Sequence, residues 1–221
     1  MKRILALSDI HGNISNVKKI ICQEEDLWMI LLCGDISRCG DPSEAEQVLD
    51  ICTQYSNTII LRGVPGNMDS AAVLDVLELQ RISLHGRGEM FESIGVCGVG
   101  GSNPTPMHTP FELLEEDLGS VLERGYKQIT AAEHKIIVSH APPRGTTLDR
   151  IKIGAHVGSE AVRTFLQTNE CSLCLCGHIH ESPGEQTVQG VMTVNIGAVL
   201  QGAYCIIEFN NNTFSVNRRH V

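Results

Sequence analysis

The sequence predicts an α/β protein in which a largely parallel sheet is covered by helices. Three short apolar runs, at residues 3–7, 28–33 and 58–61, alternate with three amphipathic segments in the first third of the chain. Strands that alternate with helices in this way are typical of layered α/β folds. Each apolar run is followed by polar residues. Because ligands of such sheets gather beyond the carboxyl ends of the strands, we expect the functional site at that edge.

The amphipathic segments carry clear helix start signals. Asn13 or Ser15 is a good N-cap for the first helix. In the second, Asp41 is the predicted cap, a proline takes the first helical position, and Glu44 can reach back to the cap. The third helix is expected over residues 70–79. Their apolar residues recur at helical spacing, so one face of each helix should pack against the sheet.

The rest of the chain is less regular. One or two short strands are expected over residues 90–99, and an irregular loop over residues 101–109. The run from Thr109 to Glu112 is predicted to cap a helix that reaches about residue 123, and Ser159 to cap another. Further strands are expected at residues 135–139, 173–176, 191–194, 203–209 and 213–216, the last two joined by a turn at residues 210–212. No repeat or linker divides the chain, and a hydrophobic content of 42% suits a single domain over residues 1–221.

Composition narrows the classes of function. The net charge is −9 and the lysines and arginines form no cluster, which argues against a broad nucleic-acid-binding face. An anionic substrate would need local positive charge, and metal ions are the natural source. The nine cysteines include several in apolar runs, and Asp9 interrupts the first apolar run too early for a signal peptide. We expect reduced thiols, a cytoplasmic location and no membrane span.

Two further stretches resemble a zinc site and a dinucleotide-binding motif, but each resemblance is weak. Cys171, Cys174 and Cys176 suggest zinc, yet two of them share a strand core and no second pair has zinc-finger spacing. The glycines of residues 98–101 resemble half of a dinucleotide fingerprint. A proline-rich loop follows them instead of the helix that such a fingerprint must open.

A set of metal-ligand side chains stands at the predicted strand ends. Its members are Asp9, His11, Asp35, Asn67, His140, His178 and His180. Oxygen and nitrogen donors without sulfur suit Mn, Fe, Co, Ni or Zn better than Ca. His178 and His180 are one residue apart and point in different directions on a near-extended backbone, so they suit two neighbouring metal ions. The seven residues are enough for two sites if one carboxylate bridges.

These motifs resemble those of the calcineurin-like metallophosphoesterases, which run D-x-H, G-D, G-N-H-[DE], a histidine motif and G-H-x-H. In this chain they stand in the same order and read Asp9-Ile10-His11, Gly34-Asp35, Gly66-Asn67-Met68-Asp69, Ser139-His140-Ala141-Pro142-Pro143 and Gly177-His178-Ile179-His180. The resemblance implies a four-layer αββα sandwich with two mixed β-sheets flanked by helices. It also implies two divalent metal ions (Mn, Fe, Ni, Co or Zn) and a small phosphate ester as substrate.

The resemblance also assigns roles. It implies that one metal is held by Asp9, His11, Asp35 and His180, and the other by Asp35, Asn67, His140 and His178. Asp35 would bridge the two ions. Asp35, Asn67, His140 and His178 would also take part in catalysis. The implied activity is hydrolysis of phosphodiester or activated phosphomonoester bonds by in-line attack of a metal-bridging hydroxide.

One position departs from the family pattern. Met68 stands where many members carry the histidine thought to protonate the leaving group, and Asp69 matches the motif's own acidic residue. We therefore expect a preference for diesters or activated monoesters, whose leaving groups need less help. His108 is an alternative proton donor, and Arg144 or Arg62 could contact a phosphate oxygen. The remaining histidines are assigned to structure or surface: His85, His134, His156 and His220.

Two other functions stay open at this point. The same fold serves as a protein-binding platform in a retromer subunit, so a catalytically silent metal-binding scaffold is an alternative. The intact ligand set argues against it, since scaffolds tend to lose metal histidines. A nucleotide-binding module without hydrolysis is weakened by the broken glycine motif.

Overall fold

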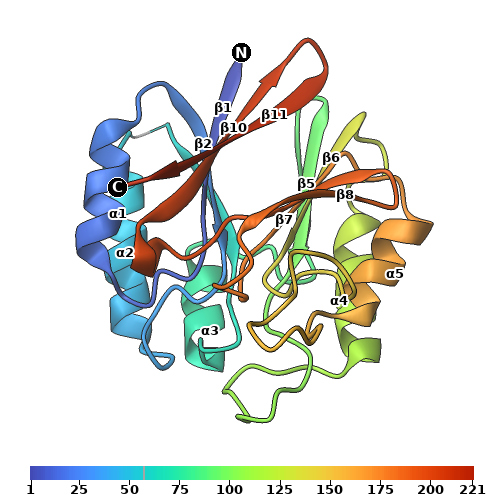
Figure 1. Cartoon of the computed structure of the whole chain (residues 1–221). Coiled ribbons are helices and arrows are strands. Elements are labelled where there is room, and N and C mark those ends of the chain that lie inside the picture. The colour runs from blue at the N-terminus through green and yellow to red at the C-terminus, as the bar shows by residue number, and fades with distance from the viewer. Residues whose placement is uncertain (57) are drawn as a thin grey trace.

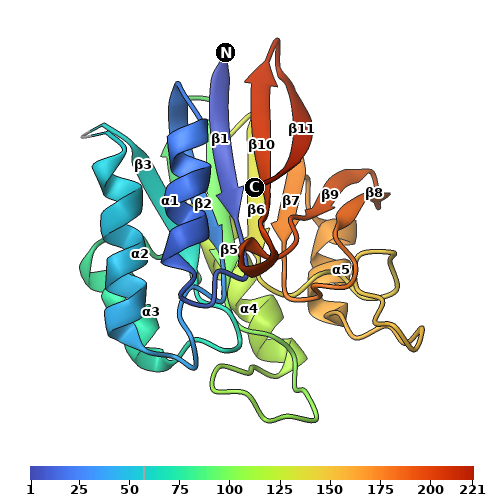
Figure 2. The ribbon, with the colours of Figure 1, turned by 60° about the vertical axis from the view of Figure 1, so that its left-hand side comes forward.

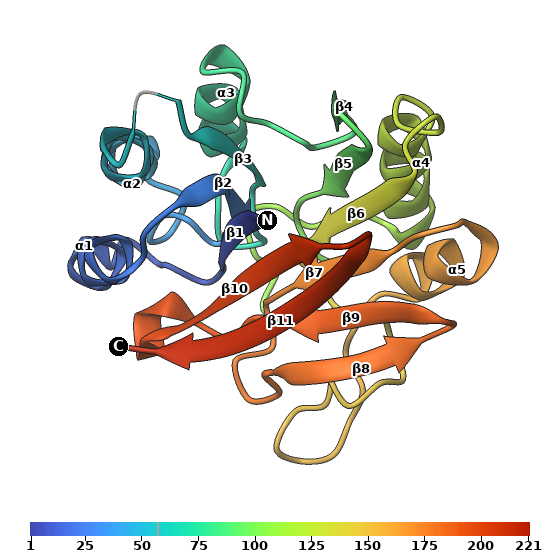
Figure 3. The ribbon, with the colours of Figure 1, turned by 90° about the horizontal axis from the view of Figure 1, so that it is seen from above.

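The computed structural model describes residues 1–56 and 58–221 and consists of two β-sheets packed face to face between two layers of helices (Figure 1, Figure 3). In order, the first sheet contains β11 (Thr213–His220), β10 (Ala203–Asn210), β1 (Lys2–Leu7), β2 (Leu27–Cys33) and β3 (Ile60–Val64). The second contains β4 (Gly88–Phe91), β5 (Ile94–Val99), β6 (His134–Ser139), β7 (Leu173–Cys176), β9 (Val191–Asn195) and β8 (Gly184–Val188).

The helices divide between the two outer faces. The first sheet is covered by α1 (Ile14–Gln23), α2 (Pro42–Gln54) and α3 (Ala71–Leu79), and the second by α4 (Glu115–Tyr126) and α5 (Glu160–Thr168). A short 3₁₀ helix, η1 (Val199–Gln201), precedes β10. The predicted four-layer αββα sandwich is confirmed. Among the described helices, none combines the length and apolarity needed to cross a lipid bilayer.

The position of strand β1 explains why every residue in its buried part is apolar, without the alternation of a half-exposed strand. Ile4 and Ala6 pack between the two sheets, while Leu5 and Leu7 pack against the helices of the outer layer. A strand buried on both faces needs apolar residues at every position. In the first sheet β1, β2 and β3 run parallel, and β10 and β11 add antiparallel pairs on one side. In the second sheet β5, β6, β7 and β9 run parallel, and β4 and β8 pair antiparallel at the two edges. The predicted parallel arrangement therefore holds for only part of each sheet.

Most predicted helix caps are confirmed. Asn13, Asp41 and Ser159 accept hydrogen bonds from the backbone N–H of Asn16, Ser43 and Val162 respectively. The prediction for Glu44 was wrong, because its carboxylate accepts from the backbone N–H of Arg38 in the preceding loop (2.7 Å). Strand β3 also begins and ends later than predicted, and β8 was not predicted.

The predicted helix start at Thr109 was wrong as well, since α4 begins only at Glu115. Thr109 and Glu112 do form the expected local hydrogen bonds, with the Thr109 N–H 2.7 Å from Glu112 Oε1. The following backbone is drawn into tertiary pairing, however. The N–H of Phe111 donates to the Asn67 carbonyl, and the N–H of Leu113 donates to the Ser102 carbonyl. These bonds hold residues 110–112 in a turn and an isolated β-bridge, so the helix begins later.

The carboxyl ends of the parallel strands meet at one edge of the sandwich. In Figure 2 these strands run downward, and the long loop between β5 and α4 hangs below them. The loops after β1 and β2 are joined by backbone hydrogen bonds from Asp9 to Gly34 (3.0 Å) and from His11 to Asp35 (2.9 Å). The Gly177 N–H likewise donates to the His140 carbonyl. The predicted site residues therefore start from adjacent backbone positions.

Candidate metal centre

Asp35 lies at the middle of the predicted site. Its Oδ2 is 3.6 Å from Nε2 of His11, and its Oδ1 is 3.5 Å from Nε2 of His140. The carboxylate is almost fully buried, with 2% of the residue exposed. The backbone N–H of Met68 donates to Oδ1 (2.8 Å). The two oxygens of one carboxylate thus face histidines from two different strands, which is the geometry expected of a bridging ligand.

Asp9 lies beside Asp35 and is fully buried. Its Oδ1 is 2.9 Å from Nε2 of His180, and its Oδ2 accepts from Ser8 Oγ (2.6 Å) and from the His178 N–H (3.0 Å). Two groups of ligand atoms each lie within 4.8 Å of one another: Asp9, His11 and His180, and Asp9, Asp35 and His140. The two groups share Asp9, and Asp35, a member of the second group, lies 3.6 Å from His11 of the first.

His140 and Asn67 form the most deeply buried part of the site. Nδ1 of His140 is 2.8 Å from the carbonyl oxygen of Cys33, which can only accept, so Nδ1 carries the hydrogen. Nε2 then faces Asn67 Oδ1 at 2.9 Å. Two acceptor atoms at this distance need a proton or a cation between them. The His178 ring lies 5.0 Å from that of His140, and all seven predicted residues are linked by such neighbouring contacts.

Several of these residues hold an uncommon backbone conformation. Asp9, His11, Asp35 and His178 have φ between 47° and 66°, in the left-handed region that side chains with a Cβ disfavour. Such residues persist only where the surroundings determine them, and they cluster at functional sites. Here the backbone hydrogen bonds between the loops after β1 and β2 constrain Asp9, His11 and Asp35, and the hydrogen bond from the His178 N–H to Asp9 constrains His178.

The motif glycines are required by close approach. A Cβ at Gly66 would collide with the Asp35 carboxylate, and one at Gly177 would collide with Ser8 and Asp9. Neither glycine has a positive φ, so close packing and not an unusual backbone conformation accounts for both. Any larger residue at these two positions would push the carboxylates out of the site.

The pKa values of the two carboxylates, Asp35 and Asp9, are shifted in opposite directions. Burial raises the pKa of Asp35 to about 7, only partly opposed by His140. Burial would also raise the pKa of Asp9, but the hydrogen bond from His180 and the charge of His140 outweigh it and hold that pKa below its usual range. A cation near Asp35 would favour its charged form and reverse the shift.

The histidines differ in the same way. Burial, with the neighbouring His140, lowers the pKa of His178 to about 3, so its ring is neutral and can offer a lone pair at neutral pH. Burial also lowers the pKa of His11. The hydrogen bond to Asp9 raises the pKa of His180. Neutral imidazole and carboxylate donors around a shared centre fit a pair of divalent cations.

Comparison with known proteins identifies the family. A family model described as "Calcineurin-like phosphoesterase" matches residues 2–182. The chain belongs to this family of metallophosphoesterases. It is 30% identical over 197 residues to the uncharacterized protein MJ1162 of Methanocaldococcus jannaschii, covering 87% of each chain. Metallophosphoesterases use divalent metals, and the donor set described above fits that use.

Solved structures agree on the fold. The protein TT1561 of Thermus thermophilus is similar with a TM-score of 0.76 at 17% identity, over 98% of each chain. A dimetal phosphatase from Danio rerio is similar with a TM-score of 0.69 at 14% identity, over 99% of this chain and 96% of that one. At these identities the likeness establishes the shared architecture.

Within the phosphoesterase motifs, Asp69 has a purely structural set of contacts. It is fully buried, and its carboxylate accepts from the backbone N–H groups of Ile36, Ser37 and Gly66 and from the Ser37 hydroxyl, at 2.8–3.0 Å. It ties the loop that carries Asp35 to the loop that carries Asn67. Because this carboxylate already accepts four hydrogen bonds, its role is to hold the two loops of the site together.

Sequence reasoning missed several supporting residues. Ser8 donates to Asp9, and Thr109 accepts from the Asn67 amide (Nδ2 to Oγ1, 3.0 Å). Glu112 in turn accepts from Thr109 (2.6 Å). The spacing of Thr109 and Glu112 was visible in the sequence but indicated a helix cap. Only the tertiary position of the loop reveals its contact with Asn67.

The two candidate phosphate-binding arginines differ in their surroundings. Arg62 forms two hydrogen bonds to Glu89 (2.6 and 2.7 Å) and lies over the ring of Phe91, so its guanidinium group is engaged within the fold. Arg144 is exposed on the loop after β6, and its backbone pairs with Ser159. His108 is exposed on the loop between β5 and α4, next to Thr109.

The other histidines support the fold. His85 accepts from the Gly100 N–H (3.1 Å), and burial lowers its pKa to about 4. His134 packs against Phe209 and Phe214. His156 pairs with the buried Asp149 (2.7 Å), and His220 is exposed on β11.

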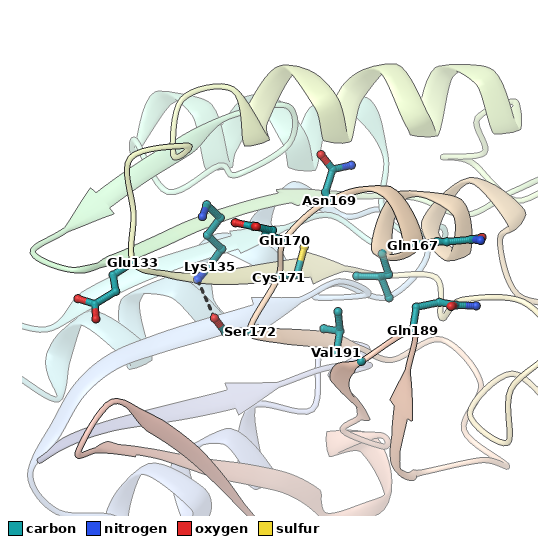
Figure 4. Close-up of a pocket in the computed structure, with 11 residues that line it drawn as sticks. Glu133, Lys135, Gln167, Asn169, Glu170, Cys171, Ser172, Gln189 and Val191 are labelled. Carbon is teal, nitrogen blue, oxygen red and sulfur yellow. Dashed lines mark hydrogen bonds between the residues drawn. The ribbon is translucent and has the colours of Figure 1, made fainter.

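A polar cavity of about 340 Å³ lies at the other edge of the second sheet (Figure 4). It is lined by residues at the amino ends of β6, β7 and β9, including Lys135, Ser172 and Val191. The Lys135 N–H donates to Ser172 Oγ (3.2 Å), while the side chains of Glu133 and Gln189 point away from one another. Its lining includes none of the seven residues of the candidate metal centre, so this cavity is separate from that centre.

Proposed function

We propose that this protein hydrolyses small phosphate esters with two divalent cations. One ion would be held by Asp9, His11, Asp35 and His180, and the other by Asp35, Asn67, His140 and His178. The observation that carries the proposal is the position of Asp35, whose two carboxylate oxygens lie 3.6 and 3.5 Å from histidines on opposite sides. Mn, Fe, Ni, Co and Zn all suit these donors.

When bound, two cations lower the pKa of a water between them and balance the charge of an in-line displacement at phosphorus. The chain's own residues prepare the site. Two divalent ions beside two aspartates leave a net positive charge, which attracts a phosphate to a protein with a net charge of −9. His140 lies on the buried side of the site, where hydrogen-bond donors and charges act most strongly, and the neighbouring His178 ring is neutral at neutral pH.

Met68 supports a preference for diesters or activated monoesters. Its side chain is half-buried directly after Asn67, and a thioether carries no proton to give to a leaving group. Esters whose alcohol is a good leaving group need no such proton. The exposed His108 is a second candidate for the proton donor, and the exposed Arg144 a candidate for a phosphate contact.

The proposal can be tested with p-nitrophenyl phosphate and bis-p-nitrophenyl phosphate. Metal-stripped protein is assayed on both esters after addition of Mn²⁺, Ni²⁺, Zn²⁺ or Mg²⁺. We expect metal-restored turnover, faster on the diester. Asp35→Asn should lower it about 1,000-fold or more, because metal ions supply several kcal/mol of transition-state stabilisation. Asp41→Asn is the matched control, since Asp41 caps α2 in the loop after β2 and asparagine caps equally well.

Each outcome has a clear reading. Turnover that disappears only in Asp35→Asn supports the enzyme. Binding of two metal ions without hydrolysis of either ester would favour the catalytically silent scaffold. A His108→Ala variant with an unchanged rate and pH profile would remove His108 as proton donor.

A further inference from the structure

Asn67 is the one amide among the proposed ligands, and its side chain has two different ends. Oδ1 can bind a metal ion, whereas the NH₂ group cannot. Oδ1 lies 2.9 Å from His140 Nε2, and Nδ2 lies 3.0 Å from Thr109 Oγ1. The hydrogen-bonding role of the Thr109 hydroxyl, as donor or acceptor, therefore decides which end of the amide faces the metal site.

The direction of hydrogen bonding at Thr109 is set by Glu112. The Thr109 hydroxyl lies 2.6 Å from Glu112 Oε1, and an ionised carboxylate can only accept. The single hydroxyl hydrogen must point at Glu112, which leaves a lone pair facing Asn67. An amide oxygen in that place would meet an acceptor, so the NH₂ group lies there and Oδ1 faces His140.

The loop is built to hold this arrangement. Glu112 Oε1 also accepts from the Thr105 hydroxyl (2.6 Å) and the Thr109 N–H (2.7 Å). The Phe111 N–H donates to the Asn67 carbonyl (3.0 Å), so the loop forms hydrogen bonds with both the backbone and the side chain of Asn67. These bonds also explain why the segment forms a turn and an isolated β-bridge where a helix was predicted.

We propose that Thr109 is a positioning residue that turns the Asn67 amide oxygen toward the metal. Glu112 fixes the direction of the two hydrogen bonds, in which the Asn67 amide donates to the Thr109 hydroxyl and that hydroxyl donates to the Glu112 carboxylate. The inference rests on the proposed function, because it assumes that Asn67 holds a cation. It adds the loop between β5 and α4 to the metal centre. Groups that orient a metal ligand typically contribute 10- to 100-fold in metal affinity.

The test is calorimetric titration of Mn²⁺ into metal-stripped protein, without any substrate. Thr109→Val removes the hydroxyl at nearly constant shape, and we expect one of the two sites to bind about 10- to 100-fold more weakly. Thr109→Ser keeps the hydroxyl and should restore the affinity. Glu112→Gln frees the hydroxyl to turn around, so it should weaken the same site.

Thr105→Val is the matched control. It removes an equally short hydrogen bond to the same Glu112 oxygen but leaves the contact between Thr109 and Asn67 in place. Equal weakening in Thr105→Val and Thr109→Val would overturn the proposal, because loop stability would then be the cause. Normal Mn²⁺ affinity in Thr109→Val, or a Thr109→Ser variant as weak as Thr109→Val, would also overturn it. If Thr109→Val does not fold, as judged by its thermal unfolding, Glu112→Gln decides in the same way.

Failure of the proposed function is distinguishable. If the unmodified protein binds no Mn²⁺, the metal centre itself is refuted. If it binds two ions and Thr109→Val binds them equally well, only the role of Thr109 is refuted.

Discussion

The candidate metal centre has an inner half, formed by Asn67 and His140, and an outer half, formed by His11 and His180. His140 and Asn67 are 0% and 2% exposed, whereas the side chains of His11 and His180 are 17% and 28% exposed. The far atoms of His140 and Asn67 are held by the Cys33 carbonyl and by Thr109. The protein has thus fixed the inner donors in advance and left the outer ones near solvent. A tightly held inner ion and a more exchangeable outer one should follow.

Asp35, which lies between the two halves, gives the largest expected effect. Its pKa is about 7 in the fold and 3.8 in the reference state, so the fold favours the protonated form. The stability that this provides is fully present below pH 3.8 and is lost as the pH rises through about 7. A shift of this size corresponds to a few kcal/mol. Above pH 7 the metal-free protein carries a buried charge at a cost that a bound cation would offset.

We therefore expect Asp35→Asn to stabilise the metal-free protein at about pH 8 and to have little effect at about pH 4. With a chelator present, the melting temperature at the higher pH should rise by about 5–10 °C, since each kcal/mol shifts it by about 2–4 °C at this size. Other titrating groups are common to both proteins and largely cancel. An unchanged melting temperature at the higher pH would mean that nearby groups already compensate the Asp35 charge. If the prediction holds, added Mn²⁺ should stabilise the unmodified protein more than the variant.

Removing one histidine from each half tests the comparison directly. Each variant should weaken the affinity for one Mn²⁺ ion by at least the roughly 10- to 100-fold that loss of an outer-shell partner costs, and His140→Ala should weaken it more than His180→Ala does. Calorimetric titration of metal-stripped protein measures both, with the exposed His220→Ala as control. A larger loss in His180→Ala than in His140→Ala would reverse the assignment of the tight site.

The sequence predicted the inner and outer ligands equally well, but not their difference. All seven stand directly after apolar strands, and parallel strands bring their carboxyl ends together regardless of local detail. The burial of His140 depends on Cys33 and on the facing sheet, which no local pattern encodes. The segment from Thr109 to Glu112 has a helix-start pattern, yet pairing with Asn67 and Ser102 overrides that preference. Strand β8 escaped prediction because its sequence, Gly-Glu-Gln-Thr-Val, is mostly polar at an exposed sheet edge.

Met68 gives the smallest expected effect and concerns what lies next to the inner half. Its N–H donates to Asp35, so its backbone is part of the site although its side chain carries no proton. Met68→His should supply a donor and raise turnover of the monoester relative to the diester by about tenfold, below the usual 10²–10⁴ for general acids because the ring is not oriented by Asp69. That carboxylate already accepts four hydrogen bonds.

The ratio of the two turnover rates decides this last prediction, because it cancels any loss in metal loading that the substitution causes. Met68→Leu is the control for a change of shape without a proton and should leave the ratio as it is. If Met68→His leaves the ratio unchanged as well, the argument from the leaving group fails, and proton donation must come from elsewhere, with His108 the next residue to test. If the ratio of monoester to diester turnover rises in Met68→His but not in Met68→Leu, the diester preference results from the absence of a proton donor at position 68, beside the more firmly held metal ion.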